Sequence, residues 1–107
     1  MSIKSISSQQ LAELCKHGKI ELIDVRTPVE FREVHVAQAR NLPLDRLSEG
    51  LEGLKRFKDK PVIVYCDQGG RAGSAMRQLA QQGFAKVVNL RGGLSAWRAE
   101  QLPVARD

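Results

Sequence analysis

The sequence predicts a single α/β domain in which a mostly parallel sheet carries helices on both faces. Short apolar runs typical of buried strands alternate along the chain with segments of helical periodicity. The chain has 107 residues, which suits one core and predicts one domain over residues 1–107. Its 42% hydrophobic and 27% charged residues are typical of a globular protein and argue against disorder.

Two helices and a strand are expected in the first third of the chain. Polar residues from Ser7 onward open an apolar pattern that Gly18 ends, which predicts a capped helix over 8–17. The apolar run over 20–25 predicts a buried strand. Because proline favours the first turn of a helix, a short helix is expected at Pro28.

The next segment is expected to hold one short strand and one or two helices. A strand within 36–42 would end at Pro43, since proline cannot donate a backbone hydrogen bond to a neighbouring strand. Apolar residues recur at spacings of three and four over 44–57, which is typical of an amphipathic helix. An interruption of this helix is expected around Gly50 or Gly53.

The second half of the chain repeats the alternation of strand and helix. Residues 61–65 form the clearest strand, because they are apolar, rich in β-branched side chains and entered through a proline. A helix is expected over 71–82 and a further strand over 86–90. The inward-facing residues of that helix are expected to be Ala75, Met76, Leu79 and Ala80. A last helix follows the pair Gly92-Gly93.

The net charge of the chain is +5, and its distribution favours small anions as ligands over nucleic acids. The densest basic stretch holds Lys55, Arg56, Lys58 and Lys60. The other basic residues are scattered and often stand beside acids, so no continuous nucleic-acid surface is expected.

The two cysteines, Cys15 and Cys66, are too few for a disulfide framework. No CxxC or Cys/His spacing indicates a zinc site. The first residues lack the apolar core of a signal peptide, and the run over 62–66 is too short to span a bilayer. A cytoplasmic protein with free thiols and no membrane partner is therefore expected.

One loop stands out as the candidate site, because it joins the clearest strand to a helix and begins with a cysteine. The loop consists of Cys66, Asp67, Gln68, Gly69, Gly70 and Arg71. Sites in open α/β sheets form at the carboxyl ends of the strands. Backbone N–H groups of such a loop can point toward one anion, and the helix that follows adds its positive end. Arg71 adds a fixed positive charge.

These features predict that Cys66 is a nucleophile held as a thiolate rather than a structural core residue. Buried cysteines are common in cores, but the polar and glycine-rich residues after Cys66 do not suit a core corner. Four residues separate Cys66 from Arg71. Cysteine phosphatases use a similar cradle with a longer spacing. The shorter loop favours a single sulfur atom over a phosphate group, which disfavours a phosphatase or an arsenate reductase.

Motifs spread over most of the chain, from about residue 6 to 97, point to one family. In chain order they are Leu22-Ile23-Asp24-Val25-Arg26, Glu30-Phe31, His35-Val36, Asn41-Leu42-Pro43, Val64-Tyr65-Cys66, Gly69, Arg71, Gly83-Phe84, Leu90-Arg91-Gly92-Gly93 and Trp97. Each motif is weak alone, but the ordered set is specific. With them, the chain resembles the rhodanese family, in particular its single-domain members.

The resemblance implies a five-stranded parallel sheet flanked by helices, and a sulfurtransferase that uses no metal or organic cofactor. The thiolate of Cys66 would attack the sulfane sulfur of a small anionic donor such as thiosulfate and release sulfite. The resulting persulfide would pass its outer sulfur to cyanide, a thiol or a protein acceptor. The chain departs from the family pattern at Val34, where glycine is frequent, and at Gln38, where the family has glycine before an alanine.

Asp67 is the residue that complicates this assignment. A carboxylate beside Cys66 is expected to disfavour the thiolate and to repel a dianionic donor. A polysulfide or a protein persulfide is therefore an alternative donor to thiosulfate. Asp67 also keeps open a second function, in which the chain is a non-catalytic persulfide carrier or interaction module that serves a protein partner.

Other polar and thiol side chains are interpreted as structural. The resemblance assigns Asp24 and Arg26 to a motif that braces the site, with Asp24 expected to pair with a cation such as Arg71. His35 is expected to be structural rather than a general base. Cys15 is interpreted as a small core residue of the first helix rather than a resolving thiol.

Overall fold

The computed structural model describes residues 4–18 and 20–107. Its strands are β1 (Lys4–Ile6), β2 (Glu21–Asp24), β3 (His35–Val36), β4 (Arg40–Asn41), β5 (Val62–Tyr65), β6 (Val87–Leu90) and β7 (Val104–Ala105). Its α-helices are α1 (Ser8–Lys16), α2 (Pro28–Glu33), α3 (Leu47–Gly50), α4 (Gly70–Gln81) and α5 (Gly93–Ala99). Two 3₁₀ helices, η1 (Leu44–Arg46) and η2 (Leu51–Phe57), flank α3.

The main sheet has five parallel strands in the order β1-β6-β5-β2-β4, which confirms the predicted sheet. β5 lies at the centre and is buried along its whole length, as expected for an apolar strand covered on both faces. Asp24 of β2 lies beside Tyr65 of β5 in the strand register. Both strands therefore end at the same edge of the sheet, where Cys66 begins its loop.

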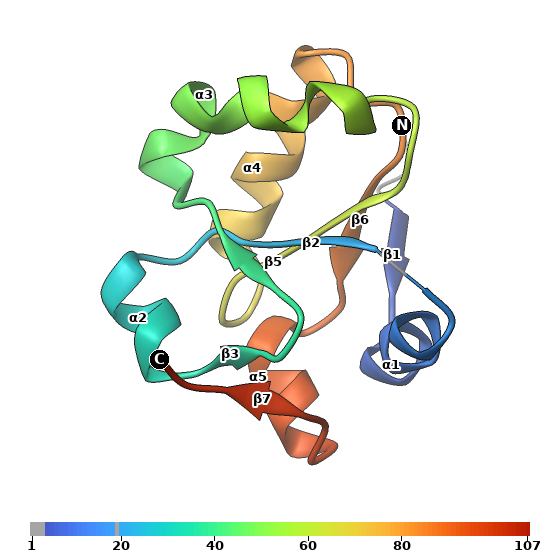
Figure 1. The fold of residues 1–107 in the computed structure, drawn as a ribbon, viewed down its shortest axis with the longest axis vertical. Coiled ribbons are helices and arrows are strands. Elements are labelled where there is room, and N and C mark those ends of the chain that lie inside the picture. Colours follow the sequence, from blue (N-terminus) through green and yellow to red (C-terminus); the bar gives the residue numbers. More distant parts are fainter. Residues whose placement is uncertain (1–3, 19) are drawn as a thin grey trace.

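Helices cover both faces of this sheet, and Figure 1 shows α3 and α4 on one side with α1 and α5 on the other. The side chains of β5 alternate between the two cores, as the pleat of a strand requires. Val62 and Val64 pack in the core beneath α3 and α4. Ile63 and Tyr65 pack in the core with residues of α1 and α5.

The N-termini of α1 and α2 each carry a capping box, which fixes the direction in which the helix starts from the preceding segment. The Ser7 hydroxyl accepts the backbone N–H of Gln10, whose side chain accepts the N–H of Ser7. Thr27 and Glu30 form the same pair of bonds at α2. The second box places the carboxylate of Glu30 near the carboxyl end of β2.

The segment over 36–42 differs from its prediction, because it forms two short strands in different sheets. β4 joins the edge of the main sheet, whereas β3 pairs antiparallel with β7. A turn closed by the N–H of Ala39 and the carbonyl of Val36 separates them. The stretch over 44–57 is helical as predicted, and its helix type changes at Gly50.

The inward face of α4 is shifted toward the N-terminal end of the helix compared with the prediction. Ala75, Met76 and Leu79 are buried, but Ala80 is exposed and its predicted inward position is wrong. Ala72 is buried in its place, because the buried stripe extends one turn toward the N-terminal end of the helix. In the described part of the chain, no helix has the length and apolar character needed to cross a membrane.

Candidate functional site

Cys66 is the first residue of the loop between β5 and α4, and only 2% of its surface is exposed. Two backbone N–H groups donate to its sulfur, from Gly69 at 3.1 Å and from Ala72 at 3.4 Å. Gly69 has φ of +133°, a conformation that side-chain-bearing residues rarely adopt, and this turn brings its N–H toward the sulfur. The cradle predicted from the loop sequence is therefore formed around the Cys66 sulfur.

The first turn of α5 donates two backbone hydrogen bonds to this loop. The N–H of Leu94 donates to the carbonyl of Cys66 at 2.9 Å, and the N–H of Ser95 donates to the carbonyl of Asp67 at 3.1 Å. Gly93 lies directly beneath these carbonyls with φ of +58°. A Cβ on Gly93 would lie within 2.6 Å of the Asp67 carbonyl oxygen and would clash with the Cys66 carbonyl. The sequence predicted a helix after Gly92-Gly93, but not this support of the loop.

Asp24 and Arg26 form a buried ion pair, with 0% and 3% of their surfaces exposed. The guanidinium of Arg26 donates to the Asp24 carboxylate at 2.8–3.1 Å. Asp24 therefore pairs with a cation as expected, but that cation is Arg26 rather than Arg71. Residues two apart at a strand end share a face, so the Arg26 guanidinium reaches Asp24 first.

Arg26 also connects its ion pair with Asp24 to the loop that begins at Cys66. Its guanidinium also donates to the carbonyl of Val34, and lies 3.4 Å from the carboxylate of Asp67. Burial alone would lower the pKa of Arg26, but the contacts with Asp24, together with the charges of Tyr65 and Asp67, raise it overall. The phenol of Tyr65 accepts the N–H of Val36 at 3.0 Å, and burial together with Asp24 raises its pKa.

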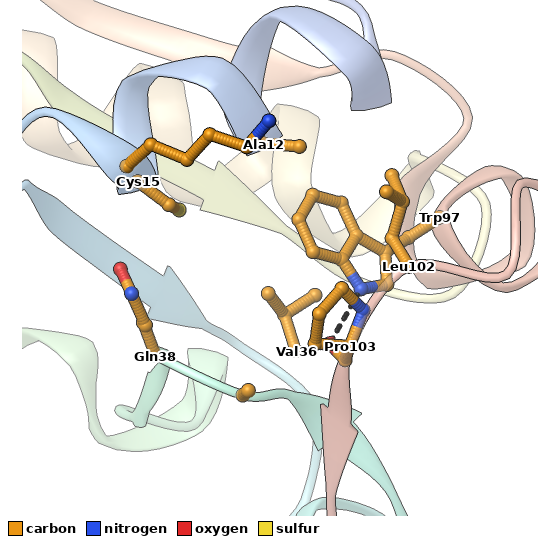
Figure 2. Close-up of a pocket in the computed structure, with 9 residues that line it drawn as sticks. Ala12, Cys15, Val36, Gln38, Trp97, Leu102 and Pro103 are labelled. Atoms are coloured by element: carbon orange, nitrogen blue, oxygen red, sulfur yellow. Dashed lines mark hydrogen bonds between the residues drawn. The ribbon is translucent and has the colours of Figure 1, made fainter.

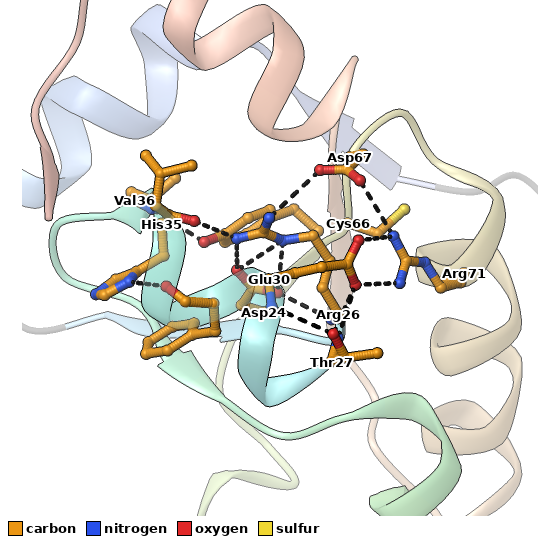
Figure 3. Close-up of polar contacts among 12 residues, drawn as sticks. Asp24, Arg26, Thr27, Glu30, His35, Val36, Cys66, Asp67 and Arg71 are labelled. Carbon is orange, nitrogen blue, oxygen red and sulfur yellow. Dashed lines mark hydrogen bonds and ion pairs between the residues drawn. The ribbon is translucent and has the colours of Figure 1, made fainter. Parts of the chain in front are cut away.

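Arg71 forms a second ion-paired group with Glu30 and Asp67, which Figure 3 shows at the mouth of the loop. Its guanidinium contacts both carboxylate oxygens of Glu30, at 2.7 and 3.1 Å, and a carboxylate oxygen of Asp67 at 3.2 Å. Asp67 therefore bridges Arg26 and Arg71 rather than standing unpaired beside Cys66. Glu30 was not predicted as a site residue. Its signal in the sequence was the capping box directly after β2.

The pair with Arg71 and the hydrogen bonds from Thr27 together lower the pKa of Glu30 to about 2, against the opposing effect of burial. A carboxylate with a lowered folded-state pKa stabilises the fold above its ordinary pKa of 4.5, and that contribution is lost as the pH falls toward 2.

We therefore expect a pH-dependent effect of Glu30→Gln on stability. The variant should unfold with a free energy about 1 kcal/mol lower than the wild type at pH 6, a value reduced for the partial exposure of this pair. The difference should shrink between pH 4.5 and pH 2. Urea unfolding of both proteins across this range measures it, and a difference that stays constant with pH would contradict the ion-pair origin.

The surroundings of His35 and Cys15 suit a structural role rather than a catalytic one. His35 is buried, stacks on the ring of Phe31 at 3.6 Å and contacts the Phe31 carbonyl through Nδ1 at 2.6 Å. Cys15 is partly buried and packs against the core beneath α1, and burial raises the pKa of its thiol. It lines a cavity of about 360 Å³ beside Trp97, shown in Figure 2, that does not include Cys66. In residues 4–18 and 20–107, no group of His, Cys, Asp and Glu could hold a metal ion.

Comparison with known proteins gives a consistent result. Residues 7–100 match the rhodanese-like domain family model. A thiosulfate sulfurtransferase GlpE of Coxiella burnetii is 39% identical over 92% of this chain and 91% of its own length. A sulfurtransferase of Allochromatium vinosum is 34% identical over 95% and 94%. An uncharacterised Synechocystis protein is 34% identical, and the chain spans only 56% of its length.

Solved structures agree with this result. A thiosulfate sulfurtransferase from Pseudomonas aeruginosa superposes with a TM-score of 0.89 at 33% identity, covering 98% of this chain and 20% of that one. A rhodanese-related protein from Thermoplasma volcanium superposes with a TM-score of 0.84 at 32% identity, covering 97% of this chain and 99% of that one.

Proposed function

Because the chain belongs to the rhodanese-like domain family, we propose that it is a sulfurtransferase that carries a sulfane sulfur on Cys66 as a persulfide. The observation that supports this proposal most directly is the cradle of backbone N–H groups around the Cys66 sulfur. Relatives of nearly equal length carry the names sulfurtransferase and thiosulfate sulfurtransferase. The proposed site consists of the loop from Cys66 to Arg71, braced by Asp24 and Arg26.

In the first half of the proposed reaction, the Cys66 thiolate attacks the outer sulfur of a donor such as thiosulfate or a polysulfide. With thiosulfate, the sulfur–sulfur bond of the donor breaks, its electron pair leaves with sulfite, and a new sulfur–sulfur bond joins the outer atom to Cys66. The negative charge of the attacking thiolate leaves with sulfite, and the outer sulfur keeps its own negative charge in the persulfide. The N–H groups of Gly69 and Ala72, which donate to the Cys66 sulfur, would stabilise its thiolate before the attack and after the sulfur has been passed on, without rearranging.

In the second half, an acceptor attacks the outer sulfur of the persulfide. Cyanide leaves as thiocyanate, and a thiolate leaves as a new persulfide. In both cases the electron pair of the broken bond returns to Cys66 as thiolate, so the cycle closes without a redox cofactor.

A second candidate function is a persulfide carrier that exchanges sulfur only with a protein partner. The observation that favours it is the pairing of both guanidiniums at the site, Arg26 and Arg71, with carboxylates. A small dianionic donor then meets no uncommitted cation among the described residues next to Cys66.

Turnover assays separate these functions. The wild type is incubated with thiosulfate or polysulfide as donor and with cyanide or a thiol as acceptor. We expect thiocyanate or the new persulfide to form over many cycles, with no product from Cys66→Ser and full product from Cys15→Ser. A single loading of sulfur without turnover would instead support the carrier, and no loading from either donor would contradict both functions.

A further inference from the structure

The charges around Cys66 do not form the electropositive site that a dianionic donor requires. Two guanidiniums, those of Arg26 and Arg71, are held by three carboxylates, those of Asp24, Glu30 and Asp67. The five side chains therefore carry a net charge of −1 before any thiolate or donor is counted.

The guanidinium of Arg71 in particular is already bonded to carboxylates. Glu30 holds its guanidinium through two hydrogen bonds in a bidentate pair, the strongest arrangement that an arginine and a carboxylate form. Asp67 occupies a further N–H group of the same guanidinium. These three hydrogen bonds leave two of the five N–H groups of the guanidinium, so an anionic donor that approaches Arg71 also meets the two carboxylates paired with it.

Thiosulfate carries two negative charges and must approach a thiolate that carries one. Like charges at close range disfavour such a complex, and repulsive groups of this kind are a common source of specificity. A donor with one negative charge or none meets less repulsion. Organic hydropersulfides combine this low charge with a transferable outer sulfur.

We propose that Glu30 and Asp67 are specificity-determining residues that select against dianionic sulfur donors and favour organic hydropersulfides. This inference rests on the proposed function of Cys66. In the favoured step, the Cys66 thiolate attacks the outer sulfur of R–S–SH, the donor sulfur–sulfur bond breaks, and its electron pair leaves as R–S⁻. The proton of the outer sulfur then passes from the Cys66 persulfide to this thiolate, which leaves as R–SH.

A matched pair of donors isolates the effect of charge. Thiosulfate and methanethiosulfonate both present an outer sulfur on a sulfonyl group, but a methyl group in the second replaces one charged oxygen of the first. Rate constants for loading Cys66 are measured with each donor by intact-mass spectrometry. Since their intrinsic reactivities differ, the informative quantity is the ratio of the two rate constants, thiosulfate over methanethiosulfonate, in each protein.

Glu30→Gln is the sharpest variant, because glutamine at this position can keep the capping box with Thr27 while removing the charge. We expect Glu30→Gln and Asp67→Asn each to raise the ratio about tenfold, and the double variant to raise it further. The control Glu33→Gln removes a charge from the same helix at an exposed position away from Arg71 and should leave the ratio unchanged. Added salt should raise the wild-type ratio, because it screens repulsion.

Loading of the wild type by cysteine hydropersulfide completes the test. Efficient loading by this donor, together with the raised ratios, supports the proposal. An unchanged ratio in both charge variants, or loading of the wild type by thiosulfate at least as fast as by cysteine hydropersulfide, would overturn it. Failure of Cys66 to accept sulfur from any of the three donors would instead remove the proposed function itself.

Discussion

Replacing Gly93 by alanine is expected to slow the loading of sulfur onto Cys66 by about 100-fold. The added Cβ would clash with the carbonyls of Cys66 and Asp67, and φ of +58° is unfavourable for alanine. The loop must therefore move away from α5, which turns the N–H groups of Gly69 and Ala72 away from the sulfur. Mass-spectrometric loading rates, with circular dichroism to confirm folding, measure the effect.

Gly53→Ala is the matched control. A Cβ at Gly53 has no neighbour within 4 Å, and its φ is not positive. This variant should load sulfur at the wild-type rate. Equal loading rates in Gly93→Ala and the wild type would show that α5 does not position the loop.

Replacing Asp24 by asparagine is expected to lower the free energy of unfolding by about 3–5 kcal/mol. The change leaves the charge of Arg26 buried without its main partner, and an unpaired buried charge is far more costly than a lost surface pair. A domain of this size has a total stability of about 5–15 kcal/mol, so the loss should be plain in urea or thermal unfolding.

Glu13→Gln provides the comparison for this prediction. Glu13 pairs with Lys16 and His17 on the exposed side of α1, where 64% of its side chain is accessible. Its loss should cost less than about 1 kcal/mol. Asp24→Asn values as small as those of Glu13→Gln would contradict the bracing role of the buried pair.

Long, strongly patterned elements were predictable because their signals are local. The strand β5 and the helix α4 both lie within one residue of where the sequence placed them, and the parallel sheet follows from the alternation of such elements. β1 and β7 were not predicted, since strands of three and two residues carry no periodic signal. Their positions depend on partners far away in the chain, β6 and β3 respectively.

In the candidate site, too, the features formed by one continuous segment were predictable and those formed by distant segments were not. The cradle around Cys66 was predictable because one continuous segment forms it. The ion pairs were not, because the partner of Arg71 is Glu30, which lies 41 residues earlier on another element. The support from Gly93 likewise depends on where α5 packs. Asp67 was recognised as unusual, but only the structure shows that Arg26 and Arg71 both pair with its charge.

The proposal that Cys66 carries the sulfur is tested most directly by the mass of the intact protein after exposure to a sulfur donor, followed by mapping of the modified peptide. We predict a gain of one sulfur atom in the wild type and in Cys15→Ser, located on the peptide that contains Cys66, and no gain in Cys66→Ser. A sulfur adduct that persists in Cys66→Ser, or that maps to Cys15, would contradict the proposal.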